Sequence, residues 1–390
     1  MEKINVVNLT KIFGSNPKKA LKLLAEGVSK DEIFNTTGQI VGLANINFTI
    51  SKGEILVVMG LSGSGKSTLI RCINRLIEHS QGQVLIDGTD ISTLDHNALL
   101  ELRRQKFGMV FQHFALFPHR NIIDNVAFGL EIQRMDKELR YEKSRSALKL
   151  VGLEDWEEAK PNQLSGGMQQ RVGLARALAV EPDILLMDEA FSALDPLIRG
   201  DMQNELLALQ VRMRKTILFI THDLDEALKI GNRVVLMKDG QIVQIGTPEE
   251  IVLFPANEYV QKFIENVDKS KVLTAKSAMV PVNITASPDD SPQTVLTNMK
   301  DNCMDRILVV KSDNILLGTV SNKILKTAIA CDEKTIVNLI DKTVPTATTN
   351  DSLKILITIL AEWSGQLPIV NEQYQLLGIV NSNNVLSALK

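Results

Sequence analysis

The chain has 390 residues, which is long enough for two or three domains that each bury a core. Its 44% hydrophobic and 23% charged residues are typical of a folded soluble protein, and its net charge of −3 gives no cationic excess, so nucleic acid is not expected as a partner. Three widely separated cysteines predict neither a disulfide framework nor a zinc site. The sequence shows no run of about 18 apolar residues and no apolar signal core, so we expect a cytosolic chain that meets a membrane only peripherally.

The N-terminal region is predicted to contain a strand at 3–13, an insertion at 14–39 and a second alternating segment at 46–50. The insertion carries apolar residues at helical spacing beside several lysines, namely Leu21, Leu24, Ala25 and Val28 with Lys18, Lys19, Lys22 and Lys30. One interpretation is a basic amphipathic helix that touches a membrane or a partner. The other is a surface helix packed on its own domain, which the short length and Gly27 favour.

A glycine-rich loop follows the apolar run 55–59, which is typical of a buried parallel strand. The loop fits the pattern G-x-x-x-x-G-K-[ST] with the residues Gly60, Leu61, Ser62, Gly63, Ser64, Gly65, Lys66 and Ser67. Glycines let backbone N–H groups converge on an anion, and the helix expected to begin near Lys66 adds its positive end. The loop therefore predicts an ATP site, in which Lys66 reaches the β- and γ-phosphates, Ser67 binds Mg²⁺ and Thr68 contacts the α-phosphate region.

Two further apolar runs end in polar residues. The run 184–187 is followed by Asp188-Glu189, and the run 217–220 by Thr221-His222-Asp223. Three buried strands with polar carboxyl ends predict an open α/β sheet whose ligand lies at that edge. We expect Asp188 to hold magnesium through water and Glu189 to polarise the attacking water.

A second anion-binding segment precedes the acid pair. It comprises Leu164, Ser165, Gly166, Gly167, Met168, Gln169, Gln170 and Arg171. We expect it to open a helix, so that Ser165 and the two glycine N–H groups form another site for a negative charge. A chain that binds one ATP does not need two such sites.

Together these motifs resemble the ATPase subunit of ABC transporters over roughly residues 3–265. The resemblance rests on the glycine loop, the segment at Ser165, Gln112, Asp188-Glu189, His222 and the D-loop residues Ser192, Ala193, Leu194 and Asp195. It implies a P-loop NTPase fold of ABC type and a head-to-tail homodimer. In that dimer each ATP lies between the glycine loop of one subunit and the Ser165 segment of the other.

The same resemblance implies roles for three further side chains. Phe13 would stack on adenine, although the family more often has tyrosine or tryptophan there, and a strand-end core residue is the alternative. Gln112 would sense magnesium and couple to the membrane subunits, and His222 would contact the γ-phosphate. The nearby Phe111, Phe114, Leu116 and Phe117 would either line a groove for a short helix of the permease or belong to the core.

The insertion at 14–39 and the stretches 108–112 and 187–199 are similar to importers of glycine betaine, proline betaine, carnitine and choline. This resemblance implies an integral membrane permease and a substrate-binding protein or domain as partners, at the cytoplasmic face of a bacterial membrane. An ABC importer of another small solute, such as an amino acid, is the nearest alternative. A soluble ABC protein of DNA repair or translation would carry two cassettes or long coiled coils, which are not visible here.

The C-terminal segment 271–390 repeats itself and lacks a nucleophile, metal cluster or paired acids that would make it an enzyme. Residues 308–310 and 316–320 recur sixty positions later as 368–370 and 376–380, so two β–α units are expected to pack on each other. The repeats, about 275–330 and 339–390, resemble a smaller α/β module, the tandem CBS pair, next to the ATPase domain at 1–270.

The CBS resemblance implies a regulatory role, through ionic strength or an adenine nucleotide such as cyclic di-AMP. Ribose-binding members usually have an acid where this chain has Ile324 and Asn384, and Asn381 replaces a hydroxyl residue. A purely structural dimerisation module therefore remains the second interpretation.

Overall fold

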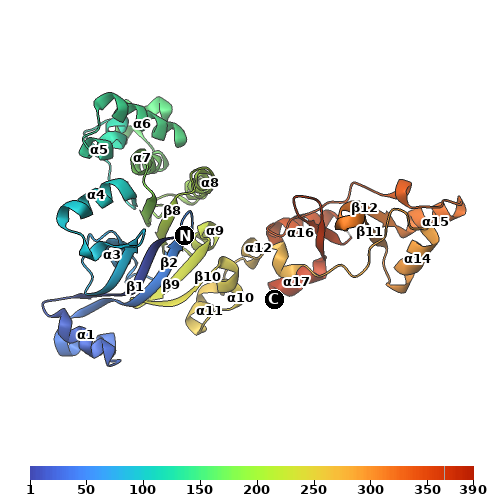
Figure 1. Cartoon of the computed structure of the whole chain (residues 1–390), viewed down its shortest axis with the longest axis horizontal. Helices are drawn as coiled ribbons and strands as arrows, with labels where there is room; N and C mark the ends of the chain where they lie inside the picture. The colour runs from blue at the N-terminus through green and yellow to red at the C-terminus, as the bar shows by residue number, and fades with distance from the viewer. Residues whose placement is uncertain (364) are drawn as a thin grey trace. The chain divides into compact units, whose positions relative to one another are not determined.

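The computed structural model describes residues 1–363 and 365–390, which divide into two compact units, Met1–Val267 and Asp268–Lys390. Figure 1 labels helices and strands of both units. In the described part of the chain, no helix combines the length and the apolar character needed to cross a bilayer. Each unit has hydrophobic clusters of its own.

The first unit contains a four-stranded sheet in the order β2-β1-β4-β5. Its strands are β1 Glu2–Phe13, β2 Ile40–Ser51, β4 Gln81–Ile86 and β5 Thr89–Asp90. The predicted strand at 3–13 is confirmed by β1, which pairs antiparallel with β2. Phe13 lies opposite Ile40 at the end of this ladder, so residues 14–39 occupy the connection of a hairpin.

A six-stranded sheet in the order β10-β9-β3-β8-β7-β6 forms the centre of this unit. The strands are β3 Ile55–Met59, β6 Phe107–Phe111, β7 Ile184–Asp188, β8 Thr216–Thr221, β9 Arg233–Lys238 and β10 Gln241–Gly246. The three predicted buried strands are confirmed as neighbours in the order β3, β8, β7, and all run parallel. Met59 pairs with Thr221, and Ile220 with Asp188, so their carboxyl ends meet at one edge.

The continuous apolar strands follow from burial on both faces of the sheet. Ile55, Val57 and Met59 of β3 join one hydrophobic cluster, while Leu56 and Val58 join the other. Side chains alternate across a strand, so a strand between two cores must be apolar at every position. The glycine loop therefore emerges from a rigid, fully buried element.

Helices surround this sheet, and α5, α6 and α7 contact one another in a helical group (Figure 1). The helices are α3 Lys66–Ile73, α4 His96–Lys106, α5 Ile122–Ile132, α6 Lys137–Leu150, α7 Gly166–Ala179, α8 Pro196–Met213, α9 Leu224–Ile230, α10 Pro248–Leu253 and α11 Glu258–Ile264, with short 3-10 turns η1 Ile91–Thr93, η2 Glu154–Trp156 and η3 Pro161–Gln163. The helix expected to begin near Lys66 is confirmed by α3.

The insertion at 14–39 is not the single helix that its apolar spacing suggested. It forms α1 Pro17–Ala25 and α2 Lys30–Thr37, and Val28 lies between them. Gly27 at φ 83° ends the first helix, and the Ser29 side chain accepts the Glu32 amide to begin the second. The apolar side chains form a cluster with the strand residues Ile12, Val41 and Ala44. The insertion is therefore packed on its own domain, as the second interpretation stated.

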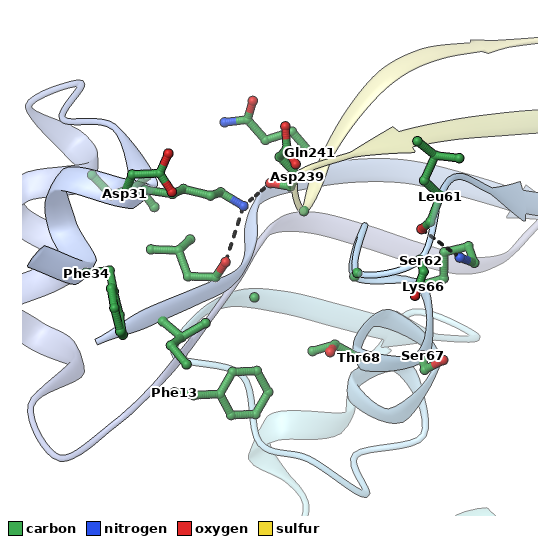
Figure 2. A pocket seen from close by; sticks show the side chains of 18 of the residues that line it. Phe13, Asp31, Phe34, Leu61, Ser62, Lys66, Ser67, Thr68, Asp239 and Gln241 are labelled. Atoms are coloured by element: carbon green, nitrogen blue, oxygen red, sulfur yellow. Dashed lines mark hydrogen bonds between the residues drawn. The ribbon is translucent and has the colours of Figure 1, made fainter. Parts of the chain in front are cut away.

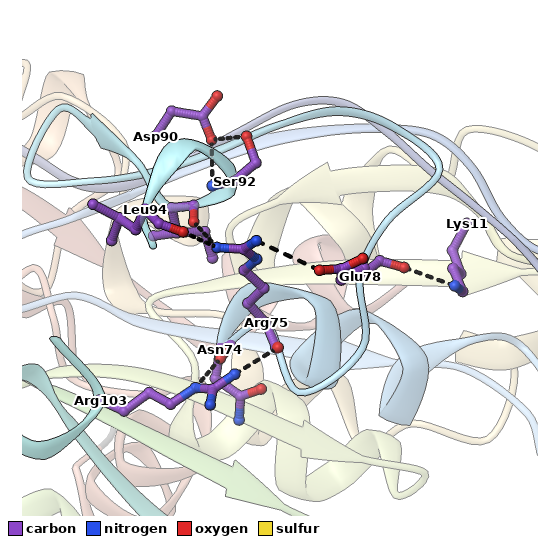
Figure 3. Close-up of polar contacts among 9 residues, drawn as sticks. Lys11, Asn74, Arg75, Glu78, Asp90, Ser92, Leu94 and Arg103 are labelled. Carbon is purple, nitrogen blue, oxygen red and sulfur yellow. Dashed lines mark hydrogen bonds and ion pairs between the residues drawn. The ribbon is translucent and has the colours of Figure 1, made fainter. Parts of the chain in front are cut away.

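The far end of α3 is fixed by arginines (Figure 3). The Arg75 guanidinium donates to the carbonyls of Ile91 at 2.8 Å and Leu94 at 2.7 Å. Arg103 donates in turn to the carbonyls of Asn74 at 2.9 Å and Arg75 at 2.6 Å. Because these bonds hold the residues that follow α3, the glycine loop at its other end is attached to a helix with little freedom to move.

The second unit contains two copies of one pattern, each a hairpin with helices. The elements are α12 Lys269–Val272, α13 Ala275–Ala278, α14 Pro292–Asp301, β11 Arg306–Val310, η4 Ser312–Asn314, β12 Leu316–Ser321, α15 Asn322–Ala330, η5 Val337–Leu339, α16 Leu353–Glu362, β13 Leu367–Val370, β14 Leu376–Val380 and α17 Ser382–Leu389. Val309 pairs with Gly318 in one copy, as Ile369 pairs with Gly378 in the other. The predicted repeat of two β–α units is confirmed.

Candidate nucleotide-binding site

The loop Gly60–Gly65 connects β3 to α3 and needs glycine at defined positions. Gly60 has φ 156°, and a Cβ there would lie 2.3 Å from the carbonyl oxygen of Met237. Gly65 is the N-cap of α3 at φ 98°, and a Cβ there would lie 2.8 Å from the carbonyl oxygen of Gly42. These positions exclude a side chain sterically, so the backbone itself faces the space at the helix start.

The start of α3 is open to an anion. Gly65 provides no side-chain cap, which leaves the first-turn N–H groups without the oxygen that usually accepts from them. The Ser64 hydroxyl is buried and has no hydrogen-bond partner in the described part of the chain. Unpaired N–H and hydroxyl groups beside the positive end of a helix dipole are suited to bind the phosphates of a nucleotide.

Lys66 crosses the loop and is 5% exposed. Its ammonium donates to the carbonyls of Gly60 at 2.8 Å and Leu61 at 3.1 Å, and it forms no ion pair with a carboxylate of the described residues. Burial lowers the pKa of Lys66, and the nearby charges of Glu189 and Asp188 oppose this shift. The ammonium is thus held in place by carbonyls while its charge remains available to an anion.

Two carboxylates lie at the sheet edge beside the loop. Ser67 donates its hydroxyl to Asp188 at 3.4 Å, the arrangement expected of two groups that share a magnesium ion. Burial and the neighbouring Glu189 raise the pKa of Asp188. A bound cation would offset this effect, so the chemistry of these donors fits Mg²⁺.

Glu189 and His222 come from neighbouring strands and meet at the edge. The Glu189 carboxylate lies 3.1 Å from His222 Nδ1, and their side chains are 22% and 55% exposed. Glu189 adopts φ 47°, a left-handed conformation that costs about 1–3 kcal/mol in a residue other than glycine. Its amide donates to the Ile220 carbonyl at 3.0 Å, which holds this geometry. Such strain is typical of functional positions.

One cavity of 1430 Å³ joins the loop to the insertion. Figure 2 shows Leu61, Ser62, Lys66, Ser67 and Thr68 at one end, and Phe13 and Phe34 at the other. The lining of this cavity comprises Phe13, Leu24, Gly27, Val28, Ser29, Lys30, Asp31, Phe34, Ile40, Val41, Gly42, Leu61, Ser62, Gly63, Gly65, Lys66, Ser67, Thr68, Glu189, His222, Asp239, Gly240 and Gln241. Its size exceeds that of most small-ligand sites, about 300–1,000 Å³, so it has room for a nucleotide.

The predicted second anion-binding segment does open a helix. Ser165 is the N-cap of α7 and accepts the Met168 amide at 3.3 Å, while Gln169 donates to the Leu164 carbonyl at 3.1 Å. A Cβ at Gly167 would lie 2.5 Å from Ile198, so glycine allows α7 to approach α8. None of these residues lines the cavity within the described chain.

The D-loop residues lie between β7 and α8. The Ser192 hydroxyl donates to the Glu189 carbonyl at 2.9 Å, and Asp195 caps α8 by accepting the Ile198 amide at 3.2 Å. Leu194 and Ala193 complete the turn. The Ser192 amide also donates to the Glu189 carbonyl, at 3.1 Å, so position 192 is linked by two hydrogen bonds to the strained Glu189.

Gln112 follows β6, whose last residue Phe111 pairs with Asp188. It does not line the cavity of the glycine loop in the described structure. Of the apolar residues near Gln112, some line a groove and others belong to the core. Phe111 and Phe117 line a separate groove of 360 Å³, whereas Phe114 and Leu116 pack against the core.

The other wall of the cavity was not predicted from the sequence. Lys30, Asp31 and Phe34 come from the insertion, and Asp239 and Gly240 from the turn between β9 and β10. The Asp-Gly dipeptide is a hairpin signal and could have located that turn. No local signal in the insertion indicates that it reaches the phosphate loop, because that placement depends on the β1–β2 pairing.

A glycine loop between a buried strand and a helix, with an acid pair two strands away in the same sheet, defines a P-loop ATPase. The ABC transporter family model matches residues 43–192, and the CBS domain model matches residues 275–330 and 336–390. The chain is 51% identical over 387 residues to the glycine betaine transport ATP-binding protein OpuAA of Bacillus subtilis, covering 99% of this chain and 92% of that protein.

A second relative is the glycine betaine/carnitine transport ATP-binding protein GbuA of Listeria monocytogenes, at 49% identity over 390 residues, with 100% and 98% of the two chains covered. The bacterial ABC transporter cassette MJ0796, solved as a dimer, matches with a TM-score of 0.53 and 34% identity, over 63% of this chain and 98% of that one. The chain belongs to the ATPase family of glycine betaine, proline betaine, carnitine and choline ABC transporters that carries tandem CBS domains.

Proposed function

We propose that this chain hydrolyses ATP to power the uptake of quaternary-ammonium compatible solutes. The geometry that supports this most directly is the open start of α3 facing Glu189 and His222 across one cavity. Relatives that match nearly the whole chain are named for glycine betaine and carnitine transport, which favours these solutes over amino acids.

Within the site, the loop amides and Lys66 hold the phosphates, and Ser67, Asp188 and Gln112 would hold Mg²⁺. The ion neutralises charge on the β- and γ-phosphate oxygens when bound. Glu189 accepts a proton from the attacking water, and His222, adjacent at 3.1 Å, contacts the γ-phosphate. Phe13 offers a ring to the adenine, with Lys11 Nζ 5.0 Å from the ring centroid.

The active form is a head-to-tail homodimer. Ser165, Gly166 and Gly167 lie outside the cavity of their own chain, which supports their action on the ATP of the partner subunit. The related cassette MJ0796 is also described as a dimer in a post-hydrolysis state bound to ADP and Pi. The dimer would work with an integral membrane permease and a substrate-binding protein or domain, as a peripheral subunit on the cytoplasmic face of the bacterial membrane.

The decisive experiment measures ATP hydrolysis by the chain reassembled with its permease in lipid. Glycine betaine, carnitine, choline and common amino acids are compared, each at low and high salt. Stimulation by a quaternary amine supports the proposal and identifies the substrate. Stimulation only by an amino acid would retain the ABC mechanism and overturn the choice of substrate.

The groove at Phe117 is proposed as the contact for a permease helix. Phe117 and Phe128 pack with ring centroids 4.5 Å apart, and Arg103, Met109 and Phe111 share the lining. An aspartate would lose the ring contact with Phe128 and would hold a carboxylate beside Arg120, where an apolar partner side chain could not pack favourably. Phe117→Asp is therefore expected to reduce co-purification of the permease severalfold while leaving ATP affinity within about twofold; Phe254→Asp, at an exposed site elsewhere, is the control. Unchanged co-purification would contradict this assignment.

The CBS pair is proposed to regulate transport, through ionic strength or an adenine nucleotide such as cyclic di-AMP. The alternative is a structural dimerisation module. Titrating the full chain carrying Lys66→Ala with cyclic di-AMP distinguishes them, because this substitution weakens the cassette's own site. Saturable binding supports a nucleotide sensor, whereas no binding at either low or high salt would overturn the nucleotide part of the proposal.

A further inference from the structure

The insertion forms one wall of the nucleotide cavity, although it lies far from the glycine loop in sequence. Leu24, Val28, Lys30 and Phe34 line the same space as Lys66. On α2 the wall presents Phe34, which is 51% exposed, beside the charged Lys30 and Asp31. Its apolar part continues across Ile40 to Phe13, which is 36% exposed. Between residues 13 and 40, the exposed large apolar side chains are Phe13, Phe34 and Ile40, and all three line the cavity.

The helix that presents Phe34 is anchored on its other side. Ile33, the preceding residue, is 0% exposed and belongs to the cluster between the insertion and the strands. The helix is capped by Ser29 at its start and ends at Gly38, which has φ 67°. Because Ile33 is buried and both ends of α2 are capped, the orientation of the Phe34 side chain is fixed by the helix. Its exposure therefore does not result from a loose segment.

A half-buried lysine attaches this helix to the rest of the site. Lys30 donates to the carbonyl of Asp239 and, at 3.3 Å, to the carbonyl of Val41. Burial lowers the pKa of Lys30, opposed by the charge of Asp239. Its donors are directed at backbone carbonyls, so this cation positions the wall and is not directed at the phosphates.

The apolar wall ends at the Phe13 ring, which packs against a glycine. A Cβ at Gly42 would lie 2.6 Å from Phe13 Cε2, so the Phe13 ring rests directly on this backbone. Figure 2 shows Phe13 and Phe34 on the same side of the cavity, with the phosphate-loop residues across from them. Aromatic rings at this end and open amides at the other match the two chemical ends of a nucleoside triphosphate.

We propose that the 14–39 insertion supplies part of the nucleobase site, with Phe34 as the contact for the base of the bound nucleoside triphosphate. Phe34 adds to Phe13 an apolar surface that excludes water from one side of the base. The proposal rests on the proposed function, because it requires ATP at the glycine loop. It assigns the insertion a role in nucleotide affinity, separate from catalysis at Glu189.

The test measures binding of ATP and of inorganic tripolyphosphate to the full chain by calorimetry. Phe34→Ala is compared with Phe34→Tyr and with Phe254→Ala, which removes another exposed phenylalanine, one that does not line the cavity. We expect Phe34→Ala to raise the Kd for ATP about tenfold, since loss of a base–aromatic contact has roughly this effect. The Kd for tripolyphosphate should stay within about twofold, and Phe34→Tyr should retain ATP affinity.

An independent readout uses Phe34→Trp. ATP should change the emission of the new indole, while tripolyphosphate should not, because only ATP carries a base. The proposal is overturned if Phe34→Ala affects ATP no more than Phe254→Ala does, or if it weakens ATP and tripolyphosphate equally. Failure of the proposed function is distinct, because the wild-type chain would then bind no ATP.

Discussion

In both units a helix follows a strand in the chain, but the N-terminus of that helix is capped differently in the two. In the first unit α3 begins at Gly65 without a side-chain cap. In the second unit Ser321 caps α15 by accepting the Ile324 amide, and Asn381 caps α17 in a reciprocal pair with Asn384. A capping oxygen and a phosphate compete for the same N–H groups. The uncapped start therefore leaves the first-turn N–H groups of α3 free for phosphate, and similar local topology does not imply similar ligands.

The largest effect is expected from a substitution that removes the catalytic carboxylate and leaves the open start of α3 intact. Glu189→Gln should lower phosphate release by about 10²–10⁴-fold, because an amide cannot accept the proton of the attacking water. ATP affinity should remain, since the loop is untouched. Glu265→Gln, at the end of α11, is the matched control. Near-normal turnover in Glu189→Gln would remove this residue from its catalytic role.

The next effect acts on the loop itself. Lys66→Ala should raise the Kd for ATP by about tenfold or more, because a charge-assisted contact to phosphate is lost. Lys262→Ala, in an exposed i,i+4 ion pair, should not change it. Equilibrium binding with a labelled nucleotide measures both, and circular dichroism checks the fold. An unchanged Kd would mean that the backbone amides alone hold the phosphates.

A smaller effect concerns the stability of the first unit. Asp183 contacts Lys3 at 2.9 Å and Lys106 at 2.7 Å, and the hydrogen bonds from Lys106 and Lys3 lower its pKa from 3.8 to about 2. A carboxyl with a depressed pKa contributes stability that is present above its unfolded pKa and is lost as the pH falls through about 2.

Asp183→Asn should therefore lower the free energy of unfolding at neutral pH by less than about 1 kcal/mol, because the side chains of Asp183 and Lys106 are substantially exposed. The loss should disappear as the pH falls from 4 toward 2. Acid titration of thermal unfolding, with Asp201→Asn as the control, measures this. A loss that persists at pH 2 would contradict the electrostatic explanation.

The smallest expected signal comes from the second unit. AMP, ADP and ATP should give no heat above dilution when titrated into a fragment of residues 268–390, because the starts of α15 and α17 are already capped, which leaves cyclic di-AMP or ionic strength as the proposed signal. A separate hydrophobic cluster supports folding of this fragment. Saturable heat with any of the three would show that these caps do not exclude phosphate, and the contrast between the units would fail.

Most of the phosphate end of the site could be predicted, because its signals are local. Glycine is required at 60 and 65 by the backbone itself, and continuous apolar runs identify strands buried on both faces. The fold of the insertion was harder to predict from the sequence. The helical spacing of its apolar residues continues across Gly27. In the structure, a turn at Gly27 and the cap at Ser29 divide the insertion into two helices. Spacing alone does not register a change of direction.

The sequence by itself determined the glycine loop, the acid pair at the end of a buried strand and the duplicated C-terminal unit, because each depends on short-range geometry or repetition. Only the tertiary structure decided that α2 faces the nucleotide cavity. That placement follows from Phe13 pairing with Ile40, and from Lys30 meeting a carbonyl at Asp239. Residues 209 positions apart are brought together by sheet pairing and burial, and neither has a signature in local sequence.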